Sequence, residues 1–293
     1  MNYRHQFHAG NFADVMKHAL LVALVRALQR KEKGFLGVDT HAGRGRYDLE
    51  VAATGDSLVR QPEWPEGIGR LWRQAGAGLP PALAAYLALV RGYDHEGGNL
   101  TAAPRFYPGS PVLLHLLARP VERLVLVEQH PAECAALRHE LGGLPRLALQ
   151  EADGYAALRG ILPPPERRAL VLIDPPFEAP DEFARIAEAL DEGLRRFRSG
   201  VFAVWYPLTV RARVDEFIAS VRALAPPPTL AAELAIAGGD SLIKLKGCGL
   251  LVINPPWQFA DEARSILDYL AGILAREPGA GGRLEWVVRE RAG

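Results

Sequence analysis

The sequence predicts an α/β protein with a mostly parallel seven-stranded sheet, covered by helices on both faces, whose last strand is antiparallel. Short apolar runs bounded by breakers recur along the chain, and helical patterns lie between several of them. Strands that are apolar throughout are typical of a sheet buried on both sides, and helices supply the crossovers between parallel neighbours. The expected strands are 35–40, 124–128, 147–150, 169–173, 200–205, 229–237 and 249–253.

The first expected helix precedes the first strand and spans residues 11–33. Asn11 can cap it, apolar residues then recur at three- and four-residue steps, and Gly34 ends it. This spacing predicts an amphipathic helix. Further helices are expected over 132–141, 181–197 and 213–224.

The last two expected strands, 229–237 and 249–253, are joined by a loop with no room for a helix. A parallel crossover takes about a dozen residues or more. We therefore expect these two strands to be antiparallel neighbours.

The segment 49–105 contains no run that predicts a strand, whereas 68–72 and 79–91 have helical patterns. Loops rich in glycine and proline enter and leave it. We therefore expect a small helical insertion over 49–105, within one domain formed by 1–48 and 106–293.

Composition excludes several classes of protein. The 293 residues carry 34 basic and 34 acidic side chains and 49% are apolar, which excludes a disordered or fibrous protein. Two cysteines, Cys134 and Cys248, exclude a disulfide framework and a four-cysteine zinc site. Charged residues interrupt the apolar stretch 12–28, so no membrane span is expected. No secretion signal is recognisable, and we expect a cytoplasmic protein.

The neutral chain has a basic beginning. Residues 1–48 hold eight basic and four acidic side chains, which leaves a formal charge of +4. This charge fits contact with phosphate groups or a solvated helix face, and the sequence favours neither.

Two glycines, Gly43 and Gly45, follow the first expected strand within the segment 39–46. Glycines at this place let a ligand approach the backbone closely. The third glycine of the dinucleotide fingerprint is absent, which disfavours a nicotinamide oxidoreductase.

Acidic residues follow the next two expected strands. Glu128 ends the second strand, where a carboxylate can accept hydrogen bonds from both ribose hydroxyls. In a simple unit of this kind the acid follows the glycines by about 20 residues, and removing the proposed insertion nearly restores this spacing for Glu128. Alternatively, Glu128 is an ordinary residue at the end of a strand. Asp153 and Gly154 follow the third strand and could bind the exocyclic amine of an adenine ring or form an ordinary turn.

The sharpest local signal is the sequence Asp-Pro-Pro-Phe at 174–177, directly after the fourth expected strand. Its prolines fix the backbone and remove two donors. The carboxylate of Asp174 and the carbonyl of Pro175 then form a pair of acceptors suited to an amino group, and Phe177 offers a stacking face for a planar base. A similar motif begins at Asn254 after the last strand, and we expect it to be structural.

The chain has a glycine loop (Gly43 and Gly45), then Glu128, then the Asp-Pro-Pro-Phe motif. In this order, these features resemble S-adenosylmethionine-dependent methyltransferases that modify exocyclic amines. The whole chain resembles the RlmJ-type 23S ribosomal RNA adenine-N6 methyltransferase family, which implies a Rossmann-like class I methyltransferase fold. The most specific matches are 3–18, 39–43, 107–111 and 205–207. The family usually carries tyrosine where this chain has Phe177, so stacking is kept and a hydroxyl is lost.

The resemblance also implies a set of site residues. It places the methyl donor against His18, His41, Gly43, Ser110, Glu128, Asp153, Gly154 and Asp174. It places Tyr3, His5 and Lys17 near the target nucleotide, and Asp174, Pro175 and Phe177 at the catalytic centre. Lys17 and His18 could instead meet the carboxylate of the donor, and His41 could be a buried histidine bonded to backbone groups. No metal is expected, because a zinc site from His5, His8 and His18 lacks a fourth ligand.

We therefore expect a monomeric enzyme that methylates the N6 amine of an adenine in 23S ribosomal RNA, free or in an assembly particle. Its donor, S-adenosylmethionine, should lie across the carboxyl ends of the first and fourth strands. One alternative is another amino-group methyltransferase, acting on guanine-N2, DNA adenine or protein glutamine. The other is a catalytically silent RNA- or nucleotide-binding module, which the intact Asp174 and glycine loop disfavour.

Overall fold

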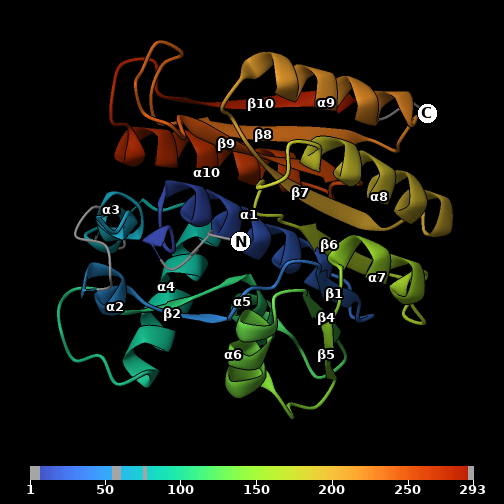
Figure 1. The fold of residues 1–293 in the computed structure, drawn as a ribbon, viewed down its shortest axis with the longest axis horizontal. Helices are drawn as coiled ribbons and strands as arrows, with labels where there is room; N and C mark the ends of the chain where they lie inside the picture. The colour runs from blue at the N-terminus through green and yellow to red at the C-terminus, as the bar shows by residue number, and fades with distance from the viewer. Residues whose placement is uncertain (1–6, 55–60, 75–77, 290–293) are drawn as a thin grey trace.

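The computed structural model describes residues 7–54, 61–74 and 78–289 of the chain, and Figure 1 shows its fold. The helices are α1 (Phe12–Gln29), α2 (Leu49–Thr54), α3 (Ile68–Trp72), α4 (Pro81–Glu96), α5 (Ser110–Leu117), α6 (Pro131–Leu141), α7 (Gly154–Ile161), α8 (Glu182–Arg196), α9 (Arg211–Ala223) and α10 (Phe259–Leu274), with a 3₁₀ turn η2 (Trp64–Glu66). The strands are β1 (Leu36–Asp39), β2 (Arg46–Asp48), β3 (Phe106–Pro108), β4 (Arg123–Glu128), β5 (Leu147–Glu151), β6 (Ala169–Ile173), β7 (Val201–Pro207), β8 (Thr229–Ala235), β9 (Gly247–Ile253) and β10 (Gly281–Val288).

The main sheet has eight strands in the order β10-β8-β9-β7-β6-β1-β4-β5, so the prediction of seven was wrong. The strand that was missed, β10, lies at the edge of the sheet with most residues exposed or half-buried, and it has two glycines and two charged residues, so it is not an apolar run. The expected antiparallel pair is confirmed, because β9 runs antiparallel to both β7 and β8. β10 is antiparallel to β8, and β4, β1, β6 and β7 pair in parallel.

Helices cover both faces of the sheet. Along β6, Leu170 and Leu172 join the core shared with α1, α5 and α10, whereas Val171 and Ile173 join the core shared with α7, α8 and α9. Figure 1 shows α7, α8 and α9 on one side of the strands and α1 and α10 on the other. Burial of every residue of β6 explains why its apolar run predicted the strand so well.

The first helix is buried on nearly all sides, so the prediction of an amphipathic helix was wrong. It packs against α4, α5, α10 and β9, and Arg26 is the exposed residue among its described side chains. Asn11 caps it as expected, since Asn11 Oδ1 accepts from the amides of Ala13 and Asp14, both at 3.0 Å. The helix ends at Gln29, earlier than predicted, where arginines from other elements bind its last carbonyls.

The two ends of the segment 49–105 lie side by side, because the residues that flank it form a two-stranded sheet in which Asp48 of β2 pairs with Phe106 of β3. The helices expected at 68–72 and 79–91 are α3 and α4. Because α4 packs on α1 and its Tyr86 is fully buried in the same core, the segment is joined tightly to the sheet domain. The division into a domain and an insertion stays a prediction.

The topology places β1 between β4 and β6, and the helices that follow β1 and β6 in the chain, α5 and α8, pack on opposite faces of the sheet. At such a switch point, the loops at the carboxyl ends of the strands diverge and open a crevice. Short helices such as α5 and α7 were not predicted because about two turns show too little periodicity. In contrast, α10 has a clear three- and four-residue apolar spacing that the sequence analysis missed.

Replacing Asn11 by alanine is expected to lower the free energy of unfolding by about 1–2 kcal/mol, because two amides at the start of α1 lose their acceptor. Urea denaturation followed by circular dichroism measures this. Arg26→Ala, an exposed change on the same helix, is the control. Equal stability of the two variants would show that the cap contributes nothing.

Candidate active site

The carboxyl ends of β1, β4, β6 and β7 border a cavity of about 940 Å³. It extends from the start of α1 to the loop between β8 and β9. The predicted site residues on its wall are Lys17, His18, His41, Gly43, Ser110, Glu128, Asp174, Pro175 and Phe177. Sites for single small molecules usually measure about 300–1,000 Å³, so the cavity is at the upper end of that range.

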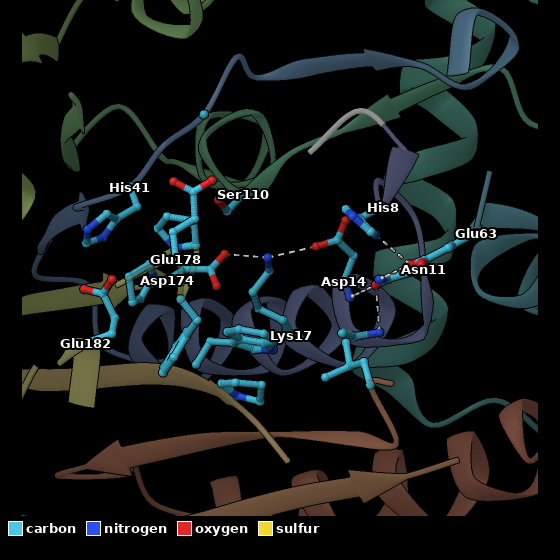
Figure 2. A pocket seen from close by; sticks show the side chains of 18 of the residues that line it. His8, Asn11, Asp14, Lys17, His41, Glu63, Ser110, Asp174, Glu178 and Glu182 are labelled. Atoms are coloured by element: carbon cyan, nitrogen blue, oxygen red, sulfur yellow. Dashed lines mark hydrogen bonds and ion pairs between the residues drawn. The ribbon is translucent and has the colours of Figure 1, made fainter. Parts of the chain in front are cut away.

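Lys17 joins the first helix to the motif that follows β6. Its Nζ donates to Asp14 Oδ1 at 2.8 Å and to Asp174 Oδ2 at 2.5 Å, and Figure 2 shows the ammonium between the two carboxylates. The side chains of Lys17, Asp14 and Asp174 are only 6%, 5% and 14% exposed. Burial lowers the pKa of Lys17, but the two aspartates outweigh it and raise that pKa well above its ordinary value. Lys17 is therefore a buried cation that holds Asp174 in place.

Asp39 ends β1 and is completely buried beside this cluster. Ser110 Oγ donates to its Oδ2 at 2.6 Å, and the amide of His41 donates to its Oδ1 at 3.2 Å. Burial is the main cause that raises the pKa of Asp39 to about 7; the Ser110 hydrogen bond opposes it and the charge of Asp174 adds to it. The carboxyl of Asp39 therefore titrates near neutral pH.

His18 is held by two buried tyrosines. Its Nδ1 and the Tyr107 hydroxyl lie 2.8 Å apart, and that hydroxyl lies 2.8 Å from the hydroxyl of Tyr86. Burial raises the pKa of Tyr107 well above its ordinary value, so the phenol stays protonated. The stacked rings of His18 and Tyr107, with centroids 5.6 Å apart, fix the imidazole at the cavity wall.

His41 is a neutral acceptor on the opposite wall. Burial lowers its pKa to about 4. The hydroxyl of Thr40 donates to the carbonyl of Leu172 at 3.0 Å, so it accepts from His41 Nδ1 at 2.8 Å. This assignment leaves Nε2 of His41 without a proton. The partner of His41 is thus a side-chain hydroxyl, not the backbone group considered for a buried histidine.

Glu128 binds the glycine loop by a hydrogen bond, although the two are far apart in the sequence. Its Oε2 accepts from the amide of Gly43 and its Oε1 from the amide of His130, both at 2.7 Å. His130 Nδ1 is buried in the same wall and has no hydrogen-bond partner among the residues that the structure describes. A buried polar atom without a partner is typical of a place where a ligand binds.

Asp153 and Gly154 are not among the residues that line the cavity. Asp153 caps α7 by accepting from the amides of Tyr155 and Ala156, and it pairs with Arg185 at 2.9 Å. Gly154 packs the start of α7 against Thr40, which follows β1, since a Cβ there would lie 2.0 Å from the carbonyl oxygen of Thr40. Their role toward a donor stays a prediction.

The two proline motifs lie at opposite ends of the sheet. Phe177 faces the cavity at the carboxyl end of β6, with φ +50°, and its ring packs edge-on against Phe183 and Trp205, with centroids 5.0 and 5.7 Å away. Asn254 follows antiparallel β9, and its amide donates to the carbonyls of Arg198 and Gly200 before β7, both at 2.8 Å. This confirms the structural role expected for the second motif.

Comparison with known proteins gives the family. A model described as ribosomal RNA large subunit methyltransferase D, RlmJ, matches residues 32–288. The ribosomal RNA large subunit methyltransferases J of Escherichia coli (strain K12) and Haemophilus influenzae are each 36% identical over 290 residues, which is 99% of this chain and 100% of theirs. The chain belongs to the RlmJ family. A crystal structure of a Legionella pneumophila protein superimposes with a TM-score of 0.83 at 33% identity, over 95% of this chain and 98% of that one.

Membership of the RlmJ family confirms the resemblance drawn from the sequence motifs, the methyltransferase fold and the expected class of enzyme. The roles of individual residues stay predictions. Tyr3 and His5, expected near the target nucleotide, lie outside the described residues.

Three residues at the RlmJ site were not assigned a role from the sequence: Asp14, Asp39 and Tyr107. All three lie in the segments that carried the family resemblance. For Asp14, the available signal was an acid three residues before a lysine on an apolar helix. For Asp39 and Tyr107 the segments gave no partner, because Ser110 and His18 reach them from other elements.

The described ranges hold no group of three or more His, Cys, Asp or Glu side chains placed to bind a metal ion. His5, one of the three histidines considered for zinc, is outside those ranges. In the same part of the chain, no helix has the length and apolar character needed to cross a membrane.

Replacing Lys17 by methionine is expected to lower the single-turnover rate of methyl transfer about tenfold or more, because Asp174 loses the buried ammonium that holds it in place. Single-turnover transfer of a labelled methyl group measures the rate. Lys17→Arg keeps the charge and serves as the control. A higher KM for RNA with an unchanged single-turnover rate would support the RNA contact expected from the sequence instead.

Asp39 should make unfolding pH-dependent. Its folded pKa of about 7 lies above that of an unfolded aspartate, so the folded chain keeps a proton that the unfolded chain loses. The free energy of unfolding then falls between about pH 4 and 7, by up to about 1.4 kcal/mol per unit. We expect Asp39→Asn to gain about 2–4 kcal/mol relative to wild type across this range in urea denaturation. A constant difference would contradict the raised pKa.

Proposed function

We propose that the protein transfers a methyl group from S-adenosylmethionine to the N6 amine of an adenine in 23S ribosomal RNA. The observation that carries the proposal is the pair of acceptors after β6, the Asp174 carboxylate and the adjacent Pro175 carbonyl, on the wall of a large cavity. An amine has two hydrogens to donate, and this pair can accept both. The similarity to RlmJ enzymes named for large-subunit ribosomal RNA supports RNA as the substrate.

The wall formed by β1 and β4 fits the adenosyl part of the donor. The carboxylate of Glu128 lies beside the Gly43 amide, where it can accept from ribose hydroxyls. His41 Nε2 is an acceptor, and the unpartnered His130 Nδ1 offers a further polar contact. When bound, S-adenosylmethionine supplies a methyl group activated by a cationic sulfur. His18 and Ser110 complete this side of the cavity.

Asp174, Pro175 and Phe177 orient the target base. The exocyclic nitrogen of adenine is a weak nucleophile because its lone pair is delocalised into the ring. Hydrogen bonds from the amine to Asp174 and Pro175 direct this lone pair toward the donor side, and the ring of Phe177 stacks on the base. Lys17 fixes Asp174 from behind, so positioning supplies much of the rate and the carboxylate receives the proton afterwards.

The substrate RNA has to present its base outside the helical stack, because the acceptors lie inside the cavity. Tyr3, His5 and Lys17 stay our expected contacts near the target nucleotide, and Asp153 and Gly154 stay expected donor residues. We also propose that the enzyme acts as a monomer in the cytoplasm, and that free RNA or an assembly particle is its substrate.

Asp174→Asn is expected to lower methyl transfer by about 100-fold or more, since the amide is a weaker acceptor that cannot take up the proton. Donor affinity should change by less than about threefold. Isothermal calorimetry and transfer of a labelled methyl group measure the two quantities. Asp181→Asn, an exposed carboxylate in the same connection and outside the cavity, is the control.

Unmodified ribosomal RNA is incubated with the enzyme and the donor, and mass spectrometry of its nucleosides then identifies the base that is methylated. The proposal expects N6-methyladenosine in large-subunit RNA. N2-methylguanosine, or methylation only of DNA or protein, would replace the proposed substrate with one of the alternative amino-group substrates. Donor binding without any transfer would point to the silent binding module.

A further inference from the structure

The loop between β8 and β9, residues 236–246, forms the side of the cavity that lies away from the glycine loop. Ile243, Lys244 and Leu245 line the cavity, whereas Leu242 is 99% exposed. A leucine exposed to this degree, next to apolar residues that face inward, marks a protruding apolar tip at the mouth of the site.

Hydrogen bonds tie the start of this loop to the segment 275–280, which connects α10 to β10. The amide of Gly238 donates to the carbonyl of Pro278 at 3.0 Å, and the amide of Arg276 donates to the carbonyl of Ile236 at 2.9 Å. Figure 1 shows the two connections, orange and red, side by side at one end of the C-terminal strands. Close packing at Gly279, where a Cβ would lie 2.7 Å from the Cα of Gly238, leaves little freedom between them.

The two connections also carry positive charge at the mouth. Lys244 and Arg276 are exposed and line the cavity. Unlike Arg185, which pairs with Asp153, neither has an ion-pair partner among the residues that the structure describes.

Carboxylates also line the cavity, with Glu128 at the end of β4 and Glu178 after β6, whereas the nearby Glu133 is paired with Arg44 at 2.7 Å. A polyanion is therefore attracted along the β8–β9 loop and repelled by Glu128 and Glu178.

We propose that this rim, Leu242 with Lys244 and Arg276, binds the RNA strand that flanks the target nucleotide. Lys244 and Arg276 contact phosphates on that strand, and Leu242 enters the base stack at the gap left by the extruded adenine. The proposal rests on the proposed function, because only a base drawn out of its stack leaves a gap to fill.

The combination of side chains is what favours a nucleic acid as the occupant. Apolar wedges beside basic residues are a known way to keep neighbouring bases unstacked, since the side chain replaces the lost stacking surface. Cations without protein partners bind phosphate oxygens and release counterions. Anchoring of the loop at its start reduces the backbone freedom that is lost when RNA binds.

Leu242→Ser tests the wedge. An RNA fragment that the wild type methylates carries 2-aminopurine beside the target adenine, and its fluorescence rises when the base is unstacked. We expect Leu242→Ser to lose about half or more of that rise and to lower kcat about five- to tenfold, with donor affinity unchanged. The defect should disappear on a fragment whose target adenine is already unpaired and unstacked. Leu100→Ser, equally apolar and 89% exposed but outside the cavity lining, is the control.

Lys244→Gln and Arg276→Gln test the phosphate contacts. Each should weaken RNA binding about three- to tenfold at low salt and reduce the slope of log K against log salt by about one. Lys33→Gln, an exposed lysine away from the cavity, is the control. Binding is measured without donor, so the result does not depend on catalysis.

Two results would overturn the proposal: Leu242→Ser with wild-type fluorescence and kcat, or salt slopes of the two cation variants equal to that of Lys33→Gln. If the wild type methylates no RNA, the proposed function fails, while the salt slopes still decide whether the rim binds RNA. Unchanged thermal midpoints, expected for such exposed side chains, separate these effects from misfolding.

Discussion

The site depends on one buried cation. Lys17 lies between Asp14 of its own helix and Asp174 after β6, and all three side chains are nearly removed from solvent. A charge in such surroundings is stable only with partners, and removing one member leaves the others uncompensated. The contact therefore fixes the first helix relative to the sheet and sets the position of the acceptor proposed to hold the target amine.

This contact exists because of the sheet topology. Parallel β1 lies between β4 and β6, so the loops after these three strands open onto the same space. Glu128 then reaches the Gly43 amide, and Ser110 reaches Asp39, across long stretches of sequence. The antiparallel β8–β9 pair extends the sheet on the far side and brings its connecting loop to the mouth of the same cavity.

The cavity is electrically divided. Glu128 and Asp174 lie at the ends of β4 and β6, where we propose that the donor binds, whereas Lys244 and Arg276 lie at the rim proposed to bind phosphates. Burial keeps His41 neutral and raises the pKa of Asp39 to about 7, so the interior has fewer charges than its composition indicates. Under the proposed function, the cationic donor and the polyanionic substrate therefore interact with different groups of the cavity.

The sequence by itself determined the parallel strands, the cap at Asn11, the motif at Asp174 and the family, because these depend on local apolar runs, local hydrogen bonds and residue order. It missed the edge strand β10, the burial of the first helix and the cluster of Asp14, Lys17 and Asp174, which only the tertiary structure decided. The burial of a helix face, and the choice of carboxylate that pairs with a lysine, depend on elements far away in the chain. Local sequence patterns hold no information on such long-range contacts.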